Sequence, residues 1–286
     1  MEDRAASTAR RMWTLFEPIH AVAYFAPEAL AVYEDAGLRG FWRGYFACRA
    51  APLGPVGPEP VAAAFFSFAP AMVARALPDV WQLTAPERAL EIRRAGAVAA
   101  LRRLLTGHEP EAERAAEALV PRAAGLDTAG RVLAAAHASL DFPDQPLDRL
   151  WHAATLLREH RGDGHVAALV AAGLDGCEAL ALRAGTDIPR SELQPYRGWT
   201  DQEWEAARLH LTERGLLLPD GTASRNGREL LRAVESATDR AAERPWRALA
   251  PDAVQDLTAL LTPVSRACAA ALRFPNPIGL PEPSGR

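Results

Sequence analysis

Long helical runs, separated by proline and glycine breaks, dominate this chain of 286 residues. The runs are rich in Ala, Leu and Arg, which favour helices, and prolines and glycines interrupt them at short intervals. They predict helices over 4–18, 27–50, 60–76, 85–106, 110–120, 127–138, 146–161, 165–184, 200–215, 225–242 and 251–272. Residues 215–223 alone indicate a short hairpin, because Asp220-Gly221 is a strong turn pair. The expected fold class is therefore mainly α.

Composition indicates an ordinary soluble protein with no general attraction to anionic partners. The net charge is −4, so neither nucleic acid nor an anionic membrane is favoured. Three scattered cysteines without a CxxC pair predict neither a disulfide framework nor a thiolate zinc site. The charged N-terminus has no secretory pattern, and the uncharged run Val61–Val73 is too short for a bilayer, so we expect a cytoplasmic protein without a membrane partner. Every basic residue is Arg, as in GC-rich, actinobacterium-like genomes.

A weak internal repeat is visible in the first two thirds of the chain. His20 and Arg49 match His137 and Arg158 in order, with aromatic residues at corresponding places. After each Arg comes a glycine-containing break and then a helix of small residues. Two related units would bring the paired His or Arg residues toward a common centre, whereas chance alignment of Ala-rich helices is the other explanation. The repeats would span 18–76 and 135–184.

The most polar helical segment is Trp151–His165, with three His, two Arg, one Glu and one Asp. At 100° per residue, His152 and Glu159 fall on one narrow polar stripe bordered by Trp151 and other apolar groups. Such a stripe is typical of a cleft or an interface, where both side chains would share a ligand. Arg158 and Arg161 provide planar donors for a carboxylate or phosphate.

The Gly162-Asp163-Gly164 sequence predicts a break in this segment. Gly162 is a natural residue after a helix end, and Asp163 is a natural cap for the next helix. His165 would then lie at the buried start of that helix, where the helix dipole and burial depress its pKa. A neutral His165 is suited to act as a base, with Glu159 orienting it. The alternative is a salt-bridge network around the glycine turn and a satisfied core histidine. The spacing of the histidines fits no metal motif.

Aromatic and basic residues also gather near the N-terminus. Residues Tyr24 and Tyr45 lie with His20, Arg43 and Arg49 in otherwise apolar helical sequence. Aromatic walls with a few polar groups indicate a small-molecule pocket. A packing core with arginines reaching toward water explains the same pattern. The proline-rich tail from Arg273 cannot be helical, and its apolar residues predict an extended arm that lies on the helical unit.

Residues from about 195 to 245 resemble the winged-helix domain of MarR-type regulators. The resemblance is carried by Arg214-Gly-Leu-Leu-Leu, the Asp-Gly turn, and Thr222-Ala-Ser-Arg-Asn-Gly-Arg-Glu-Leu-Leu. It implies that 199–214 occupies the position of the recognition helix. That segment begins with Asp201, Glu203 and Glu205, and residues 195–247 hold nine Arg against nine acidic residues. Carboxylates repel phosphates, so DNA binding is disfavoured, although Thr200 and Glu203 form a capping box that explains part of the acidity.

The whole chain resembles a family of actinobacterial proteins labelled helix-turn-helix. The segments that carry this are His20–Phe25, Gly40–Gly54, LREHRGDGHVAAL, Gly198-Trp199-Thr200 and Phe274-Pro-Asn-Pro-Ile-Gly-Leu-Pro. The resemblance implies a winged helix and leaves the activity open. We expect three regions: a helical ligand or active-site domain over 1–187, a winged-helix-like domain over 188–247, and a C-terminal helix with an arm over 248–286.

Two functions follow from these observations, and a structural interaction protein without a pocket is the third explanation. The leading one is a small-molecule-binding protein, and an enzyme is one form of it. In that form His165 or His152 with Glu159 performs acid-base chemistry, and Arg49 or Arg158 anchors a small polar or anionic metabolite. The alternative is a ligand-responsive, MarR-like regulator that binds DNA as a homodimer. No sequence motif identifies a cofactor.

Overall fold

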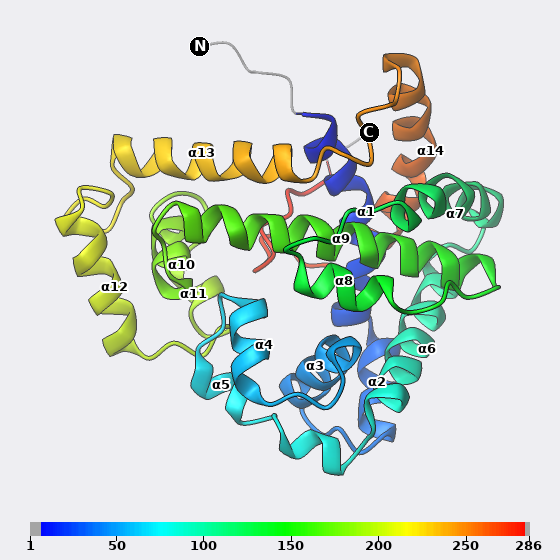
Figure 1. Ribbon diagram of the computed structural model, residues 1–286, viewed down its shortest axis with the longest axis horizontal. Helices are drawn as coiled ribbons and strands as arrows, with labels where there is room; N and C mark the ends of the chain where they lie inside the picture. The colour runs from blue at the N-terminus through cyan, green and yellow to red at the C-terminus, as the bar shows by residue number, and fades with distance from the viewer. Residues whose placement is uncertain (1–6, 284–286) are drawn as a thin grey trace.

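The structure, a computed structural model, describes residues 7–283 and consists almost entirely of helices (Figure 1). The helices are α1 (Thr8–Phe25), α2 (Pro27–Asp35), α3 (Phe41–Ala50), α4 (Pro58–Phe65), α5 (Pro70–Ala74), α6 (Pro86–Leu104), α7 (Glu109–Ala124), α8 (Val132–Ala138), α9 (Pro146–Ala171), α10 (Gly176–Ala184), α11 (Arg190–Leu193), α12 (Asp201–Glu213), α13 (Arg225–Ala241) and α14 (Pro251–Ala269), with short 3₁₀ helices η1 (Ala51–Leu53) and η2 (Asp79–Gln82). The expected mainly α class is confirmed.

The prolines and glycines that punctuate the sequence set most helix ends. Several helices begin with proline in the first turn, where its missing N–H costs nothing. The predicted helix over 27–50 is instead two helices, because Gly37 and Gly40 adopt φ of 78° and 86° between them. The capping box predicted at Thr200 is present, with Thr200 Oγ1 accepting from Glu203 N at 3.2 Å.

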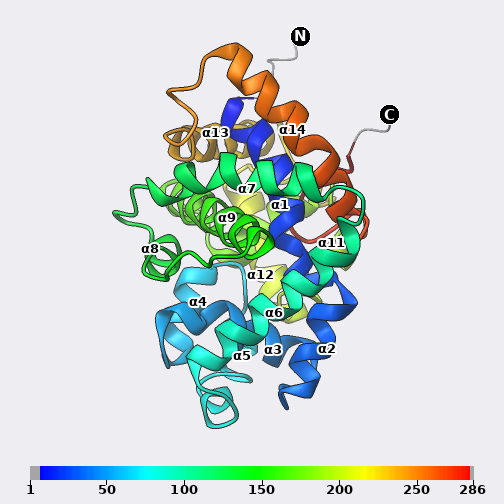
Figure 2. The ribbon, with the colours of Figure 1, turned by 90° about the vertical axis from the view of Figure 1, so that its right-hand side faces the viewer.

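Helix α9 is the central element of the fold. In both views it crosses between α13 on one side and α3, α4 and α5 on the other (Figures 1 and 2). Its middle is buried, and α1, α6, α7, α8 and α13 all pack against it. Side chains from its two faces therefore reach most of the other helices.

The buried apolar residues form three cores. The largest joins α1, α6, α7, α9 and α14, and the arm after α14 packs on it through Phe274, Ile278 and Leu280, as the sequence predicts. A second core holds α2–α5 with α6 and α8. A third core holds the end of α9 with α10–α13. The division of the chain into domains stays a prediction.

Residues 176–241 fold as a helix-turn-helix followed by a small hairpin. A turn over 194–200 joins the short α11 to α12, and the predicted hairpin follows. Within residues 7–283, the isolated bridge between Leu217 and Ala223 is the only β pairing, closed by Gly221 at φ 84°. Ala223 N also donates to Gly185 O at 2.8 Å, so the hairpin is tied to the end of α10. We refer to 176–241 as the helix-turn-helix unit.

The lengths and compositions of the helices within residues 7–283 bear on whether they could span a membrane. No single helix there is long and apolar enough to cross a bilayer, and only the bent pair of α9 and α10 has the required length and composition.

Candidate ligand cavity and its polar network

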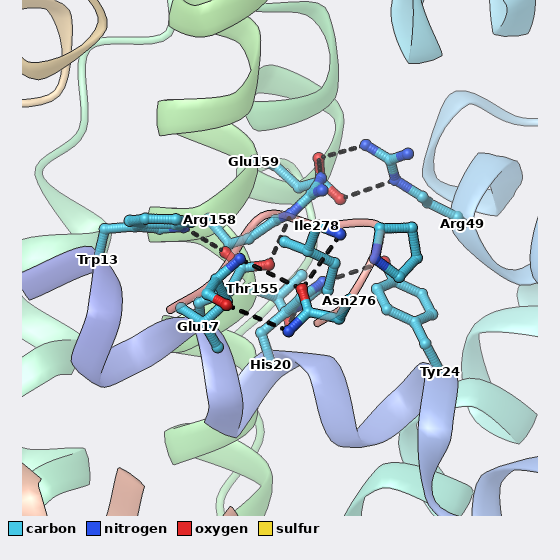
Figure 3. A network of polar contacts seen from close by, with 12 residues as sticks. Trp13, Glu17, His20, Tyr24, Arg49, Thr155, Arg158, Glu159, Asn276 and Ile278 are labelled. Atoms are coloured by element: carbon cyan, nitrogen blue, oxygen red, sulfur yellow. Dashed lines mark hydrogen bonds and ion pairs between the residues drawn. The ribbon is translucent and has the colours of Figure 1, made fainter. Parts of the chain in front are cut away.

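A buried carboxylate lies between two arginines at the centre of the molecule. Glu159 on α9 accepts from Arg49 Nε and Nη2 of α3 at 3.2 Å each, and from Arg158 Nη1 at 2.7 Å (Figure 3). Burial opposes ionisation of Glu159, but the two guanidinium groups hold its pKa well below the ordinary value. The corresponding arginines of the proposed repeat thus meet on one carboxylate, whereas the duplication itself stays a prediction.

Neutral His20 lies beside this ion cluster. Its Nε2 is 3.0 Å from the Tyr24 hydroxyl, and that hydroxyl accepts from Arg93 Nη2 at 2.8 Å. Tyr24 therefore donates to Nε2, and the Nδ1–H of His20 donates to Thr155 Oγ1 at 2.9 Å (Figure 3). Burial, reinforced by the nearby Arg158, lowers the pKa of His20 well below its ordinary value. His20 is held as a neutral tautomer behind the Tyr24 ring.

Arg93 of α6 continues the network, and no sequence pattern predicted it as a site residue. Its Nη1 donates to His137 Nε2 at 3.1 Å, so His20 and His137 are joined through Tyr24 and Arg93. Arg93 is 1% exposed, and its guanidinium lies 5.2 Å from the ring of Trp151. In the sequence Arg93 is one of many arginines on an amphipathic helix, and only the adjacent Arg94 distinguishes its position from the others. This buried cation and its neutral partners join four helices, α1, α6, α8 and α9, around one polar centre.

A cavity of about 600 Å³ opens from this centre toward the helix-turn-helix unit. This size is ordinary for a small-molecule site. Aromatic side chains of α1, α3 and the α4 region form one wall, and Leu180, Leu231 and Val234 of the helix-turn-helix unit form the opposite wall. A second cavity of about 620 Å³ lies beside it, more polar and covered by the C-terminal arm. Arg158, Gly162 and His165 line both cavities.

The structure brings together only part of the sequence-predicted site. The predicted residues that line the first cavity are Tyr24, Tyr45, Arg49, Arg158 and His165. The predicted residues behind its polar end are His20, Trp151 and Glu159. Arg161 faces the second cavity, where it pairs with Glu235 at 3.3 Å and lies 4.2 Å over the Trp13 ring.

Three predicted site residues lie away from both cavities. Arg43 is exposed on the outside of α3. His152 is buried against Phe142, with ring centroids 4.8 Å apart, so it does not share a ligand with Glu159. Asp163 Oδ2 accepts from Ala134 N at 2.8 Å and therefore caps α8.

His165 is the predicted base that does face the cavity. Its Nδ1 is 2.9 Å from Thr238 Oγ1, and that hydroxyl donates to Val234 O at 2.8 Å. Because the Thr238 hydroxyl hydrogen is already used in this bond, the hydroxyl oxygen can only accept from His165. Nδ1 therefore carries the imidazole proton, and Nε2 keeps a free lone pair. Burial lowers the pKa of His165 to about 4, so the ring is neutral at pH 7. It can accept a hydrogen bond or a proton from a bound molecule.

The predicted break at residues 162–164 is wrong. Helix α9 runs through Gly162, Asp163 and Gly164 without interruption, so His165 lies in mid-helix and no helix dipole acts on it. A Cβ on Gly164 would lie 2.7 Å from Arg131 Nη1 and 3.0 Å from Ala241 Cβ. Arg131 in turn donates to Ala241 O at 2.7 Å. Gly164 therefore allows α13 to approach α9 closely, and this tertiary packing overrides the weak helix propensity of glycine.

Gly162 has no comparable packing reason to be glycine. A Cβ there would meet only Arg158 Nη1, at 3.6 Å, and Glu159 Oε2, at 3.9 Å, which are ordinary contacts. Its missing side chain instead leaves space where the two cavities meet.

Substitution of the two glycines should therefore have opposite effects on stability. We expect Gly162→Ala to raise the free energy of unfolding by about 0.5–1 kcal/mol, because alanine favours the helix. Gly164→Ala, its matched control in the same helix, should lower that free energy by about 1–3 kcal/mol through overpacking. Urea denaturation measures both. Equal changes in the two variants would contradict the assigned packing.

No metal-binding cluster occurs in residues 7–283, where no three His, Cys, Asp or Glu side chains converge.

These features define a helical protein in which a helix-turn-helix unit closes one side of a ligand-sized cavity. The chain belongs to a helix-turn-helix family, whose model matches residues 9–275. No curated protein and no solved structure matches the chain. The likeness to MarR-type regulators and the actinobacterial source stay predictions.

Proposed function

We propose that this protein is a ligand-responsive helix-turn-helix regulator, in which a small molecule in the first cavity controls the helix-turn-helix unit. One observation carries the proposal: the cavity is lined from both sides. Tyr45 and Arg49 come from the helical body, whereas Leu180, Arg197 and Leu231 come from the helix-turn-helix unit. A ligand that contacts both sides binds one relative placement of them more tightly than others, and it shifts the population toward that placement.

Binding of a neutral fluorescent probe, phenylnaphthylamine, tests the cavity and its coupling together. We expect the probe to bind and to slow amide hydrogen exchange in α10–α13, because it bridges both walls. Gly162→Leu should weaken binding at least about tenfold, since the new side chain occupies the junction of the cavities. Ala167→Leu places the same side chain on an exposed position of α9 and is the matched control. Probe binding without protection of α10–α13 would contradict the coupling.

The charge on α12 constrains how such a regulator contacts DNA. Asp201, Glu203 and Glu213 are exposed on this helix, and Arg190 is already paired with Asp201 at 2.5 Å. The first turn of α12 therefore offers carboxylates where phosphate contacts need cations. We infer that phosphate contacts come from α13, where Arg225, Arg228 and Arg232 are exposed beside the hairpin.

Gel-shift titration with DNA from upstream of the protein's own coding region tests this assignment. We expect binding that weakens as salt rises, and Arg232→Gln should reduce both affinity and the salt dependence. Arg88→Gln is the control, because Arg88 on α6 is also exposed and also paired with a glutamate three residues away. Equal loss in both variants would indicate nonspecific charge effects. A complete absence of retardation would remove DNA from the proposal.

An acid-base enzyme is the second candidate, favoured by the free Nε2 lone pair of His165. In this function His165 takes a proton from a molecule in the cavity. The second candidate differs from the first in the fate of the ligand. Native mass spectrometry of protein purified from its own host identifies a retained molecule, and incubation then shows whether it is released unchanged. Conversion that His165→Gln abolishes would favour the enzyme.

A further inference from the structure

Arg197 differs from the other arginines that line the first cavity. The others each have a carboxylate partner: Arg49 and Arg158 share Glu159, Arg183 pairs with Asp187, and Arg273 pairs with Glu192. Among residues 7–283, no carboxylate lies within ion-pair distance of Arg197. Its positive charge is therefore uncompensated inside a largely apolar cavity, which is costly unless a partner arrives.

The contacts of Arg197 hold its guanidinium group in place but leave part of its hydrogen-bonding capacity and its charge without a partner. Nη1 donates to Tyr196 O at 3.1 Å, and Nη2 donates to Pro277 O of the C-terminal arm at 3.0 Å. Nε is buried and has no hydrogen-bond partner among the described residues. The guanidinium carbon lies 4.7 Å from the centre of the Phe68 ring. Burial lowers the pKa of Arg197 to about 10, so the group still carries its full charge at pH 7.

Tyr45 supplies a second donor beside this cation. The Phe68 ring that supports Arg197 also contacts the Tyr45 ring, with centroids 5.5 Å apart. The Tyr45 hydroxyl accepts from Arg49 Nη1 at 2.9 Å, and its own hydrogen has no acceptor among the described residues. A phenol oriented by an arginine in this way presents its O–H to the cavity.

The surroundings strengthen the demand for an anion. Arg49 and Arg158 both repel the charge on Arg197, as their lowering of its pKa shows. Glu159 and Glu17 offset two of these three cations, so one positive charge remains. Around it the walls are rings and aliphatic chains, with Trp42, Phe65 and Phe68 on one side. One uncompensated charge in such walls suits a single negative charge on an apolar body.

We propose that Arg197 and Tyr45 form an anion subsite that selects a ring-bearing monoanion, such as an aromatic carboxylic acid. The acidic group receives hydrogen bonds from the Arg197 guanidinium and the Tyr45 hydroxyl, and the ring system lies against Phe65 and Phe68. The lone pair of His165 Nε2 accepts from any hydroxyl or amide that the ligand carries farther along the cavity. This inference rests on the proposed ligand cavity and gives its ligand class.

A matched probe pair measures the anion preference. Anilinonaphthalenesulfonate carries the ring system of phenylnaphthylamine with one added sulfonate group. Fluorescence titration of the wild type should show about ten- to hundredfold tighter binding of the sulfonate, as a charge-assisted hydrogen bond provides. Arg197→Gln should reduce this preference to about threefold or less and leave the affinity for the neutral amine unchanged. Arg183→Gln, which removes a compensated cation from the same cavity, should keep the preference.

Two further variants distinguish a role of Arg197 in ligand recognition from a role in holding the C-terminal arm. Arg197→Lys keeps the charge without the planar fork and should retain part of the preference. Tyr45→Phe leaves Arg197 and its contact with Pro277 intact and should lower the preference about three- to tenfold. Equal wild-type affinity for the two probes, or a preference that survives Arg197→Gln, overturns the subsite. Phenylnaphthylamine binding with protection of α10–α13 would then leave the proposed function standing, whereas failure of both probes to bind overturns both.

Discussion

Lowering the pH from 7 to 5 is expected to remove most of the stability of this protein, because it folds around neutral histidines. Burial lowers the pKa of His137 to about 3 and those of His152, His160 and His165 to about 4. These values lie below the unfolded value, so the unfolded chain binds more protons and stability falls as pH falls through 6.5 toward 4. At pH 5 each histidine costs about 2 kcal/mol, which together approaches the whole stability of an ordinary domain.

One carboxyl group acts in the opposite direction. Burial raises the pKa of Asp163 to about 6, so the folded state binds this proton more tightly and gains about 1 kcal/mol between pH 7 and 5. This gain is smaller than the cost from the histidines. The net expectation is a cooperative loss of helix between pH 6.5 and 4, measured by far-ultraviolet circular dichroism and by urea denaturation at each pH.

His152→Leu isolates one titrating group in this prediction. His152 Nε2 is buried without a hydrogen-bond partner, so its replacement by an apolar side chain should cost little at pH 7. At pH 5 the variant should be about 2 kcal/mol more stable than the wild type, and its acid midpoint should lie lower. A variant that loses stability with pH in parallel with the wild type would show that another group drives the acid transition.

The existence of most helices could be predicted, because Ala-, Leu- and Arg-rich runs with proline breaks specify them locally. The break at 162–164 could not be judged in this way. Gly162 and Gly164 weaken a helix, but the contacts of Gly164 with Arg131 and Ala241 come from residues distant in sequence. Packing of α8 and α13 around α9 keeps α9 continuous, and this packing cannot be deduced from the spacing of residues in the sequence.

The polar site was predictable where charge stood out from its helix and unpredictable where it did not. Glu159 and the adjacent Arg158 are charged residues in an otherwise apolar run, which indicated a site. The structure places Glu159 at the polar centre. His152 shares its helical face, yet seven residues separate the two by about 10 Å along the axis, so they meet different neighbours. Arg93 and Arg197 could not be distinguished among 32 basic residues, because only tertiary packing buries Arg93 and places Arg197 in the cavity wall.

Glu159→Gln is expected to cause a large loss of stability, because it removes a buried carboxylate that pairs with two arginines. Glu159 is fully buried, and its charge compensates Arg49, with a side chain 7% exposed, and Arg158, with 18% exposed. Glutamine keeps the size and part of the hydrogen bonding, so the loss reports the missing charge. Leaving a buried charge without its partner costs about 3–5 kcal/mol. The free energy of unfolding in urea measures this cost.

Two comparisons make the Glu159 prediction specific to burial and to pairing. Glu91→Gln removes the carboxylate of the exposed Arg88–Glu91 pair and should cost about 1 kcal/mol or less. In the double variant Glu159→Gln with Arg49→Met, the cation that Glu159→Gln leaves without a carboxylate is also removed, whereas Arg158 keeps its pairing with Glu17. The loss in the double variant should therefore be smaller than the sum of the single losses. If the two glutamine variants were equally stable, or if the two losses simply added, the central ion cluster would not be a coupled, desolvated unit.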